Sequence, residues 1–175
     1  MNNLILLGKE YGMDIEVFKE KNNSTNISTL NDKVKLFQIT NVNTYIIKAI
    51  KDNRCVKLVT ENIKNTKELV EALNDIFLTS DNKNSNRLCS GNIKNRVKKD
   101  EVIDYTLVKK DLVSLNDLKK DYPCIKSIEA EFSHVLCGNY ITNLVNDCSM
   151  EDEAYFDSYG ASITVENNNL TRVLY

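Results

Sequence analysis

The clearest hydrophobic pattern in the chain lies over Thr66–Leu78. Five apolar residues recur there at i, i+1, i+4, i+7 and i+8: Leu69, Val70, Leu73, Ile76 and Phe77. This spacing places them on one face of a helix. Asn65 can cap the first turn, and Glu68 stands three residues later, as in a capping box. The pattern predicts a helix whose apolar face packs on a sheet, with a groove for a partner as the alternative.

Two other segments have the pattern of a helix. The apolar run Leu4–Leu7 is followed at a short distance by Gly12, which suits a short helix with a glycine stop. Residues 112–122 form the second segment, with Ser114 as the expected cap and Pro123 directly after the end. Proline cannot continue a helix, so we expect this helix to end there.

Short alternating stretches between these helices predict β-strands. In the first half they are Ile15–Phe18, Thr25–Leu30, Lys33–Thr40, Tyr45–Ile50 and Cys55–Thr60. In the second half they are Val102–Val108, Ile125–Leu136, Tyr140–Val145, Ala154–Val165 and Thr171–Tyr175. Asp52-Asn53 is expected to form a hairpin turn, and the later strands an antiparallel meander.

These elements predict an α+β fold with a mostly antiparallel, bent sheet. We expect two lobes, each with a helix and antiparallel strands, at residues 1–80 and 102–175. Residues 81–101 are polar and rich in Asn and Lys, and are expected to form a connector. One continuous domain is the alternative.

Composition narrows the class of protein. The 175 residues are 42% hydrophobic and 27% charged, which is typical of a globular chain. The formal net charge is -2, so there is no bulk positive field for nucleic acid or an anionic membrane. Only 5 Gly and 1 Pro occur, so Asn and Asp must form most turns, Asn31-Asp32 among them.

Cysteine usage and the N-terminus bear on the compartment. The 5 cysteines are odd in number, widely spaced and without a C-x-x-C motif, which favours free thiols in a reducing cytoplasm. The apolar run Leu4–Leu7 is too short for a signal peptide or a membrane span. We therefore expect a cytoplasmic protein.

The chain is poor in groups for catalysis. It has a single histidine, His134, whereas a zinc site normally uses three or four protein ligands. Other possible ligands come from separate stretches: Cys137, Asp147, Cys148 and Asp152. No G-x-S-x-G, P-loop or G-x-G-x-x-G motif occurs. We predict no catalytic residue, no metal and no cofactor, and expect His134 to be a half-buried strand residue.

Two charged clusters are expected to be solvated. The basic one is Lys94, Arg96, Lys98 and Lys99; it has no interleaved aromatic residues and acids follow it, so phosphate contact is the weaker alternative. The acidic one is Glu151-Asp152-Glu153, predicted to lie on a loop.

An aromatic cluster follows the acidic one. On a strand, Tyr155 and Tyr159 share a face and Phe156 takes the other. Core packing is the simpler interpretation. The alternative is a contact surface, because tyrosine is favoured at interfaces, and it makes Tyr155 and Tyr159 the candidate partner-contacting residues.

Several motifs together resemble the TldD/PmbA metallopeptidase-like family, once named modulators of DNA gyrase. Gly12–Val17 reads G-M-D-I-E-V, similar to the family opening G-x-D-x-A-E-V. Ile47–Arg54 stands at the V-R-V…D-G-R hairpin, with Asn53 in place of glycine, and the helix follows. In the second half, Leu144–Cys148 stands at an N-S-x-G turn, without its glycine.

The resemblance implies a non-catalytic N-terminal domain. In the family, a C-terminal region carries the H-E-x-x-x-H zinc motif, whereas the N-terminal region shapes a chamber and contributes dimer contacts. The resemblance thus implies a scaffold or partner subunit of a peptide-processing assembly, paired with itself or with a larger TldD/PmbA-type subunit. Peptide would be met only through that assembly. An independent α+β binding module and a small enzyme with scattered site residues are the alternatives.

Overall fold

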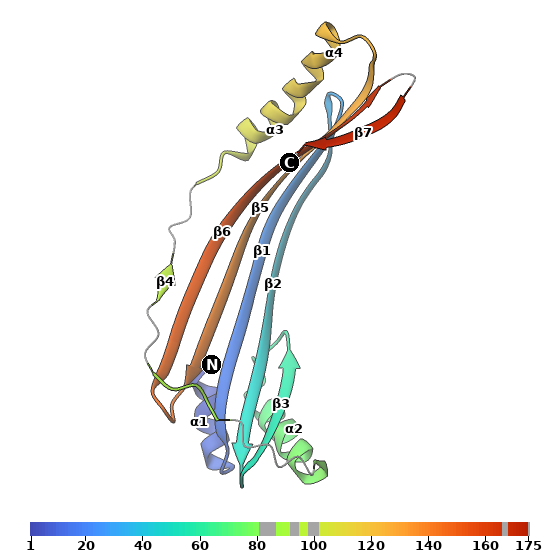
Figure 1. Cartoon of the computed structure of the whole chain (residues 1–175). Helices are drawn as coiled ribbons and strands as arrows, with labels where there is room; N and C mark the ends of the chain where they lie inside the picture. The colour runs from blue at the N-terminus through green and yellow to red at the C-terminus, as the bar shows by residue number, and fades with distance from the viewer. Residues whose placement is uncertain (81–86, 92–94, 98–101, 166–167, 175) are drawn as a thin grey trace. The chain divides into compact units, whose positions relative to one another are not determined.

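One mixed sheet organises the chain in the computed structural model, which describes residues 1–80, 87–91, 95–97, 102–165 and 168–174. Seven strands of these ranges join in the order β3-β2-β1-β5-β6-β4, with β7 paired to β6 (Figure 1). The strands are β1 Asp14–Leu30, β2 Lys33–Lys51, β3 Arg54–Thr60, β4 Arg96–Val97, β5 Ile125–Asn143, β6 Cys148–Val165 and β7 Asn168–Leu174.

The helices are α1 Asn2–Glu10, α2 Thr66–Thr79, α3 Tyr105–Ser114 and α4 Leu118–Asp121, with a 3₁₀ turn over Leu115–Asp117. The pairs β2·β3 and β6·β7 are antiparallel, and the short pair β4·β6 is parallel. The predicted α+β class is confirmed. None of the helices in the described ranges combines the length and hydropathy needed to cross a bilayer.

The chain forms two compact units. Unit 1 comprises Met1–Asn22, Val42–Lys98 and Cys137–Ala154, and unit 2 comprises Asn23–Asn41, Lys99–Leu136 and Tyr155–Tyr175. The expected lobes, 1–80 and 102–175, were contiguous, whereas these units interleave along the chain. The reason is that β1, β2, β5 and β6 are 17, 19, 19 and 18 residues long and each contributes to both units.

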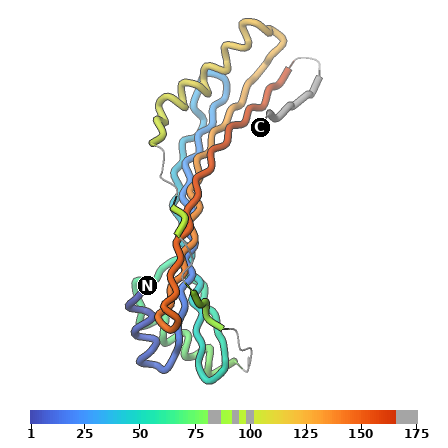
Figure 2. Tube along the Cα trace, turned by 60° about the vertical axis from the view of Figure 1, so that its left-hand side comes forward, coloured from blue at the N-terminus to red at the C-terminus, as the bar shows by residue number. Residues whose placement is uncertain are grey.

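Long strands replace the shorter ones that the pattern predicted. β1 runs through the polar stretch 19–24, and β5 runs from Ile125 to Asn143 without a break, as the trace in Figure 2 shows. The expected breaks were wrong because polar residues do not end a strand when both neighbours supply ladder hydrogen bonds. Strand propensity depends on such context more than helix propensity does.

The turns are built by Asn and Asp, as predicted. Asp52 and Asn53 have φ of 50° and 58° and join β2 to β3, where Lys51 pairs with Arg54. Two central residues with positive φ make a type I′ turn, which matches the twist of the strands. Asn31, with φ of 56°, turns β1 into β2, and Asp147, with φ of 47°, lies where the family motif has its turn.

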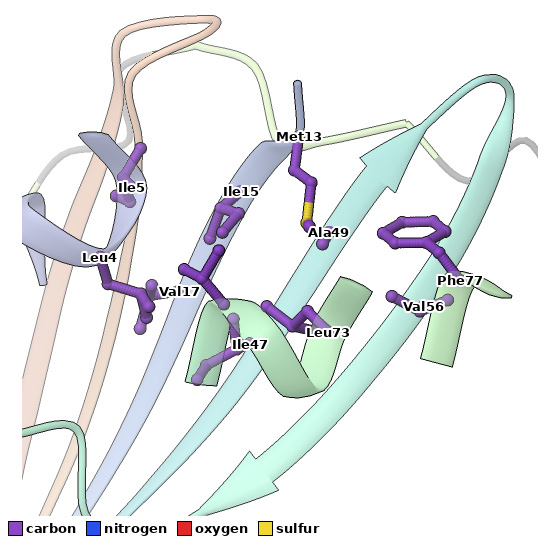
Figure 3. Close-up of a cluster of buried hydrophobic side chains, with 11 residues drawn as sticks. Leu4, Ile5, Met13, Ile15, Val17, Ile47, Ala49, Val56, Leu73 and Phe77 are labelled. Carbon is purple, nitrogen blue, oxygen red and sulfur yellow. The ribbon is translucent and has the colours of Figure 1, made fainter. Parts of the chain in front are cut away.

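The core of unit 1 lies between the sheet and two helices. Leu4 and Ile5 of α1, and Leu73 and Phe77 of α2, point toward strand residues in Figure 3. The strand side consists of Ile15, Val17, Ile47, Ala49 and Val56. Each fully buried Leu, Ile, Val or Phe side chain contributes about 1.5–3 kcal/mol. The predicted packing of the 66–78 stripe on the sheet is confirmed.

The ends of α1 and α2 differ in how they are held. Gly12, with φ of 72°, follows α1 as the glycine stop predicted. Asn65 precedes α2 but makes no side-chain cap hydrogen bond, so the predicted capping box is wrong. Burial of Val70, Leu73 and Phe77 holds this helix instead, consistent with packing outweighing local signals.

In unit 2, α3 covers the sheet. Val108 and Leu112 pack on Ile27, Ala130 and Phe132, which form a second buried cluster.

The prediction of a strand over Val102–Val108 was wrong. Asp104 accepts hydrogen bonds from the amides of Thr106 and Leu107 and starts α3 at Tyr105, and this cap outweighs the β-branched composition.

The helix expected over residues 112–122 is also revised. Ser114 does not cap a helix, because its hydroxyl donates to the Asp111 carbonyl at 2.7 Å. A 3₁₀ turn over Leu115–Asp117 links α3 to α4, and the helical path ends at Asp121, two residues before Pro123. The predicted stop at proline is confirmed.

Candidate functional site

The candidate contact residues lie on one surface of unit 2, here called the tyrosine face. It consists of His134 of β5 and Tyr155, Asp157 and Tyr159 of β6, and the buried Phe132 of β5 lies against Tyr159. Tyr155 and Asp157 both contact His134. Tyr159 contacts Phe132, which lies two residues before His134 on β5. Alternate residues of a strand share a face, so the prediction that Tyr155 and Tyr159 point the same way is confirmed.

His134 is the centre of this face. Its Nδ1 lies 2.6 Å from Oδ1 of Asp157, and its ring stacks on Tyr155 with 5.7 Å between centroids and 18° between planes. The imidazole is 12% exposed and the carboxylate 49%. The prediction of a half-buried strand histidine is confirmed. Asp157 and Tyr155 fix the orientation of the ring.

A hollow of about 170 Å³ adjoins His134 and Tyr155. Ile39 and Leu136 supply apolar lining, whereas Thr25 and Asn41 supply polar lining. Tyr105, the first residue of α3, closes another side. The hollow therefore presents hydroxyl and amide groups next to the stacked rings of His134 and Tyr155. Such groups can form hydrogen bonds with a small polar ligand.

Tyr159 lies at a second, larger hollow of about 330 Å³. Its ring is 4.7 Å from that of Phe132 and tilted by 48°, and the residue is 55% exposed. Small residues make the depression: Ser28, Ser133, Ser158 and Gly160. A partner side chain could occupy this depression and pack against the exposed Tyr159 ring.

The acidic cluster is not the solvated loop that was predicted. Residues 151–153 belong to β6, and the Glu153 side chain is 11% exposed. Glu153 accepts a hydrogen bond from the Tyr140 hydroxyl and another from Lys21 Nζ at 3.2 Å. The bond from Tyr140 lowers the pKa of Glu153 and the Lys21 ammonium adds to this, whereas burial opposes it. The partners are 13 and 132 residues away in sequence, so no local motif indicates them.

The other sequence candidates do not gather into one site. Among the described residues, no three His, Cys, Asp or Glu side chains form a group that could hold a metal ion. Of the basic cluster, Arg96 is exposed on β4 and pairs in register with Asp152, whereas Lys94, Lys98 and Lys99 lie outside the described residues.

Comparison with known proteins shows which solved structures have a fold similar to that of this chain. The sequence matches no protein-family model and no curated protein. Among solved structures, a candidate modulator of a DNA gyrase from Thermotoga maritima aligns with a TM-score of 0.73 at 14% identity, covering 98% of this chain and 40% of that one. TldE from Thermococcus kodakarensis aligns at 0.61 and 13% identity, with 98% and 40% covered. The chain has a TldE-type fold.

A third structure agrees. A candidate modulator of DNA gyrase from Bacteroides thetaiotaomicron aligns with a TM-score of 0.62 at 13% identity, covering 98% of this chain and 43% of that one. The resemblance to the TldD/PmbA family indicated by Gly12–Val17 and the Asp52-Asn53 hairpin is thus confirmed at the level of the fold. The TldE-type fold here spans about two fifths of the length of these neighbours.

Proposed function

We propose that this chain is a TldD/PmbA-type N-terminal domain that acts as a non-catalytic scaffold or partner subunit in a peptide-processing assembly. The observation that carries the proposal is the shared fold, with TM-scores of 0.73 to the Thermotoga protein and 0.61 to TldE. Nearly the whole chain, 98%, aligns with only 40% of TldE and of the Thermotoga protein. The proposed role is the one that the family resemblance implies for the N-terminal region, namely to shape a chamber and to contribute dimer contacts.

The histidine count supports a non-catalytic role for these 175 residues. An H-E-x-x-x-H motif needs two histidines, and the chain has one. His134 already contacts Asp157 and Tyr155. A catalytic zinc site normally takes three protein ligands, so the metal in such an assembly would be held by other residues.

The tyrosine face is the proposed partner surface, with Tyr155 and Tyr159 as contact residues. Tyr159 is 55% exposed and projects beside the 330 Å³ hollow. Tyrosine is enriched among residues that dominate binding energy. The proposed partner is a second copy of the chain or a larger TldD/PmbA-type subunit, in the cytoplasm. Neither nucleic acid nor a membrane is a proposed partner.

Association is the direct test. The chain should form a complex with the H-E-x-x-x-H-bearing homologue of its own genome, or with itself, in light scattering coupled to size exclusion. Tyr159→Ala should weaken that complex by about tenfold or more. Tyr122→Ala is the matched control, because Tyr122 is 58% exposed at the end of α4 and off the tyrosine face. A monomer that recruits no homologue contradicts the proposal.

Zinc analysis tests the non-catalytic part separately. The purified chain should hold no stoichiometric zinc by mass spectrometry and should not cleave peptides without the larger subunit. Stoichiometric zinc, together with peptidase activity that His134→Ala abolishes, would overturn it.

An independent binding module is the second candidate. The observation in its favour is the 170 Å³ hollow, where polar side chains surround His134 and Tyr155. This function requires a monomeric chain in which a small ligand shifts the His134 ring signals in an NMR titration.

A further inference from the structure

The 170 Å³ hollow lies on the face of unit 2 that α3 covers. Thr25 lines the hollow, and Ile27, two residues further along β1, is buried against α3. Leu136 lines it from β5, four residues after the buried Phe132. Alternate residues of a strand share a face, so the hollow continues this covered face beyond Tyr105, the first residue of α3. All of its described lining residues belong to unit 2.

Two aromatic walls of the hollow are held by contacts within the protein. The Tyr155 ring stacks on the His134 ring, with 5.7 Å between centroids. The Tyr105 ring meets the Phe37 ring edge-on, with 6.1 Å between centroids. Because both rings are already oriented by a neighbour, a ligand would not have to order them, which lowers the entropic cost of binding.

Thr25 brings a buried hydroxyl to the hollow. The residue is 7% exposed, and within the described ranges its hydroxyl makes no hydrogen bond. Thr29, on the same face of β1, differs because its hydroxyl donates to the Ala130 carbonyl at 3.4 Å. Buried polar side chains nearly always have a hydrogen-bond partner. A ligand atom in the hollow would give Thr25 the partner that the described part of the chain does not supply.

Three further polar side chains line the hollow without a hydrogen bond to the described residues, namely Asn23, Asn41 and Tyr105. Hydroxyl and amide groups can each donate and accept hydrogen bonds. None of the described lining residues is Asp, Glu, Lys or Arg. The hollow therefore suits a ligand group that itself both donates and accepts.

The charges beside the hollow compensate each other. The His134 Nδ1 lies 2.6 Å from Oδ1 of Asp157, so a charged imidazole there is matched by a carboxylate. Asp157 itself does not line the hollow. An ionic ligand would lose hydration without meeting an opposite charge of its own, and burying such an ion is costly. An uncharged ligand group is therefore favoured.

The size of the hollow narrows the ligand further. Sites for drug-sized ligands are about 300–1,000 Å³, whereas this hollow is about 170 Å³. It suits a terminal group of a few heavy atoms. A primary carboxamide is such a group, because its oxygen accepts and its nitrogen donates twice. It is also planar and can lie flat against the Tyr155 ring, whereas a polyol cannot.

We propose that this hollow is a binding site for a primary carboxamide, with the Thr25 hydroxyl and the Asn23 and Asn41 amides as its hydrogen-bond partners. Small free amides carry this group, and so do the glutamine and asparagine side chains of a partner chain. His134 and Tyr155 belong to the tyrosine face, so use of the site by a partner chain rests on the proposed function. Binding of a free amide does not.

The test is an NMR titration of the full chain with propionamide at constant pH. The chain has one histidine, so the ring signals of His134 are unambiguous, and they should shift and saturate. Propionate and propionamidinium have the same planar shape with a negative and a positive charge. Each should bind at least tenfold more weakly than propionamide. Equal or tighter binding of either ion or of ethylene glycol overturns the proposal, and so does a propionamide titration without saturation.

A variant tests the role of the buried hydroxyl. Thr25→Val removes the hydroxyl and keeps the β-branched shape, so it should weaken propionamide binding about two- to tenfold, the effect of one neutral hydrogen bond. Thr40→Val is the matched control, because Thr40 does not line the hollow, and its affinity should equal that of wild type. Equal affinities of the two variants contradict the assignment of Thr25. The comparison of probes on the wild-type chain needs no variant to fold.

Two further probes distinguish the sources of the amide. N-acetylglutamine methylamide carries the carboxamide on a peptide unit, and N-acetylglutamate methylamide is its charged match. Saturation by the glutamine probe supports a partner side chain as the ligand, and saturation by propionamide alone supports a small free amide. Equal binding of the glutamate probe overturns the proposal. A chain that binds propionamide but recruits no homologue in light scattering keeps this site and loses the proposed function, and the reverse result does the opposite.

Discussion

Tyr155 stacks on His134, with 5.7 Å between the ring centroids and 18° between the ring planes. Asp157 holds the same imidazole through Nδ1 at 2.6 Å. Stacked aromatic pairs contribute about 0.5–1.5 kcal/mol beyond the area they bury. A double-mutant cycle with Tyr155→Ala and His134→Ala should therefore give a coupling of that size in urea unfolding monitored by circular dichroism.

The contribution of the Tyr155 ring can be measured separately from that of its hydroxyl. Tyr155→Phe keeps the ring and should retain most of the coupling to His134. If the effects of Tyr155→Ala and His134→Ala simply add, the two rings do not stabilise each other and the tyrosine face lacks the fixed geometry described above.

A second prediction compares a buried and an exposed leucine on α2, the helix that packs on the core of unit 1. Leu73 of α2 is fully buried and Leu78 of the same helix is 77% exposed. Leu73→Ala should cost about 2–5 kcal/mol of unfolding free energy, because it leaves a cavity between α2 and the sheet. Leu78→Ala, its control, should lie within about 0.5 kcal/mol of wild type. If Leu73→Ala and Leu78→Ala lower the unfolding free energy equally in chemical denaturation, Leu73 is not on the face of α2 that packs on the sheet.

Two glycines give a third prediction with opposite signs. Gly12 has φ of 72°, a conformation that costs an L-residue about 1–2 kcal/mol, so Gly12→Ala should destabilise the chain by that amount. Gly160 lies in β6 without a positive φ, and a Cβ there meets nothing within 4 Å. Gly160→Ala should stabilise by about 0.4–1 kcal/mol, since it restricts the unfolded chain. Thermal unfolding of the two variants checks the contrast.

Local patterns predicted the features that depend on neighbours in sequence. The stripe of α2 and the Asp52-Asn53 turn both follow from spacing and backbone preference within a few residues. The shared face of Tyr155 and Tyr159 follows from the two-residue repeat of a strand. The start of α3 was not predicted although its signal, the cap residue Asp104, is local, because residues 102–108 also have the β-branched composition of a strand.

The remaining features could not be predicted because they join distant segments. Lys21 meets Glu153 across 132 residues, and Glu16 meets Cys89 across 73. The continuity of β1 through its polar middle likewise depends on neighbouring strands. The sequence shows how many charged and polar residues the chain has. Which of them contact one another depends on the order of the strands in the sheet.

Asn143 provides a fourth prediction. It is buried and bonds Glu16, the Cys89 carbonyl and the Asn146 amide. Asn143→Ala should cost about 1–3 kcal/mol, because buried partners lose their hydrogen bonds. The amide of Asn146 should also exchange faster with deuterium. The control is Asn41→Ala, at an exposed position, which should change neither quantity. Unchanged exchange at Asn146 in the Asn143 variant would contradict the network.

The last prediction concerns pH and the Glu153 carboxylate. Its pKa is lowered in the folded chain, first by the hydrogen bond from Tyr140 and then by Lys21. A carboxyl whose folded pKa is depressed contributes stability above its unfolded pKa, about 4.3, and loses it as pH falls through the folded value. Glu153→Gln should therefore destabilise the chain at pH 7, and the difference from wild type should shrink at pH 3.

The matched control is Glu71→Gln, because Glu71 is 49% exposed and the Lys67 ammonium with which it pairs is 3.8 Å away. An exposed pair of this kind contributes little, so urea unfolding of this variant should follow wild type at both pH values. If the Glu153 variant instead keeps the same deficit at pH 3 as at pH 7, the carboxylate charge is not what Tyr140 and Lys21 stabilise. The cluster would then act through packing alone.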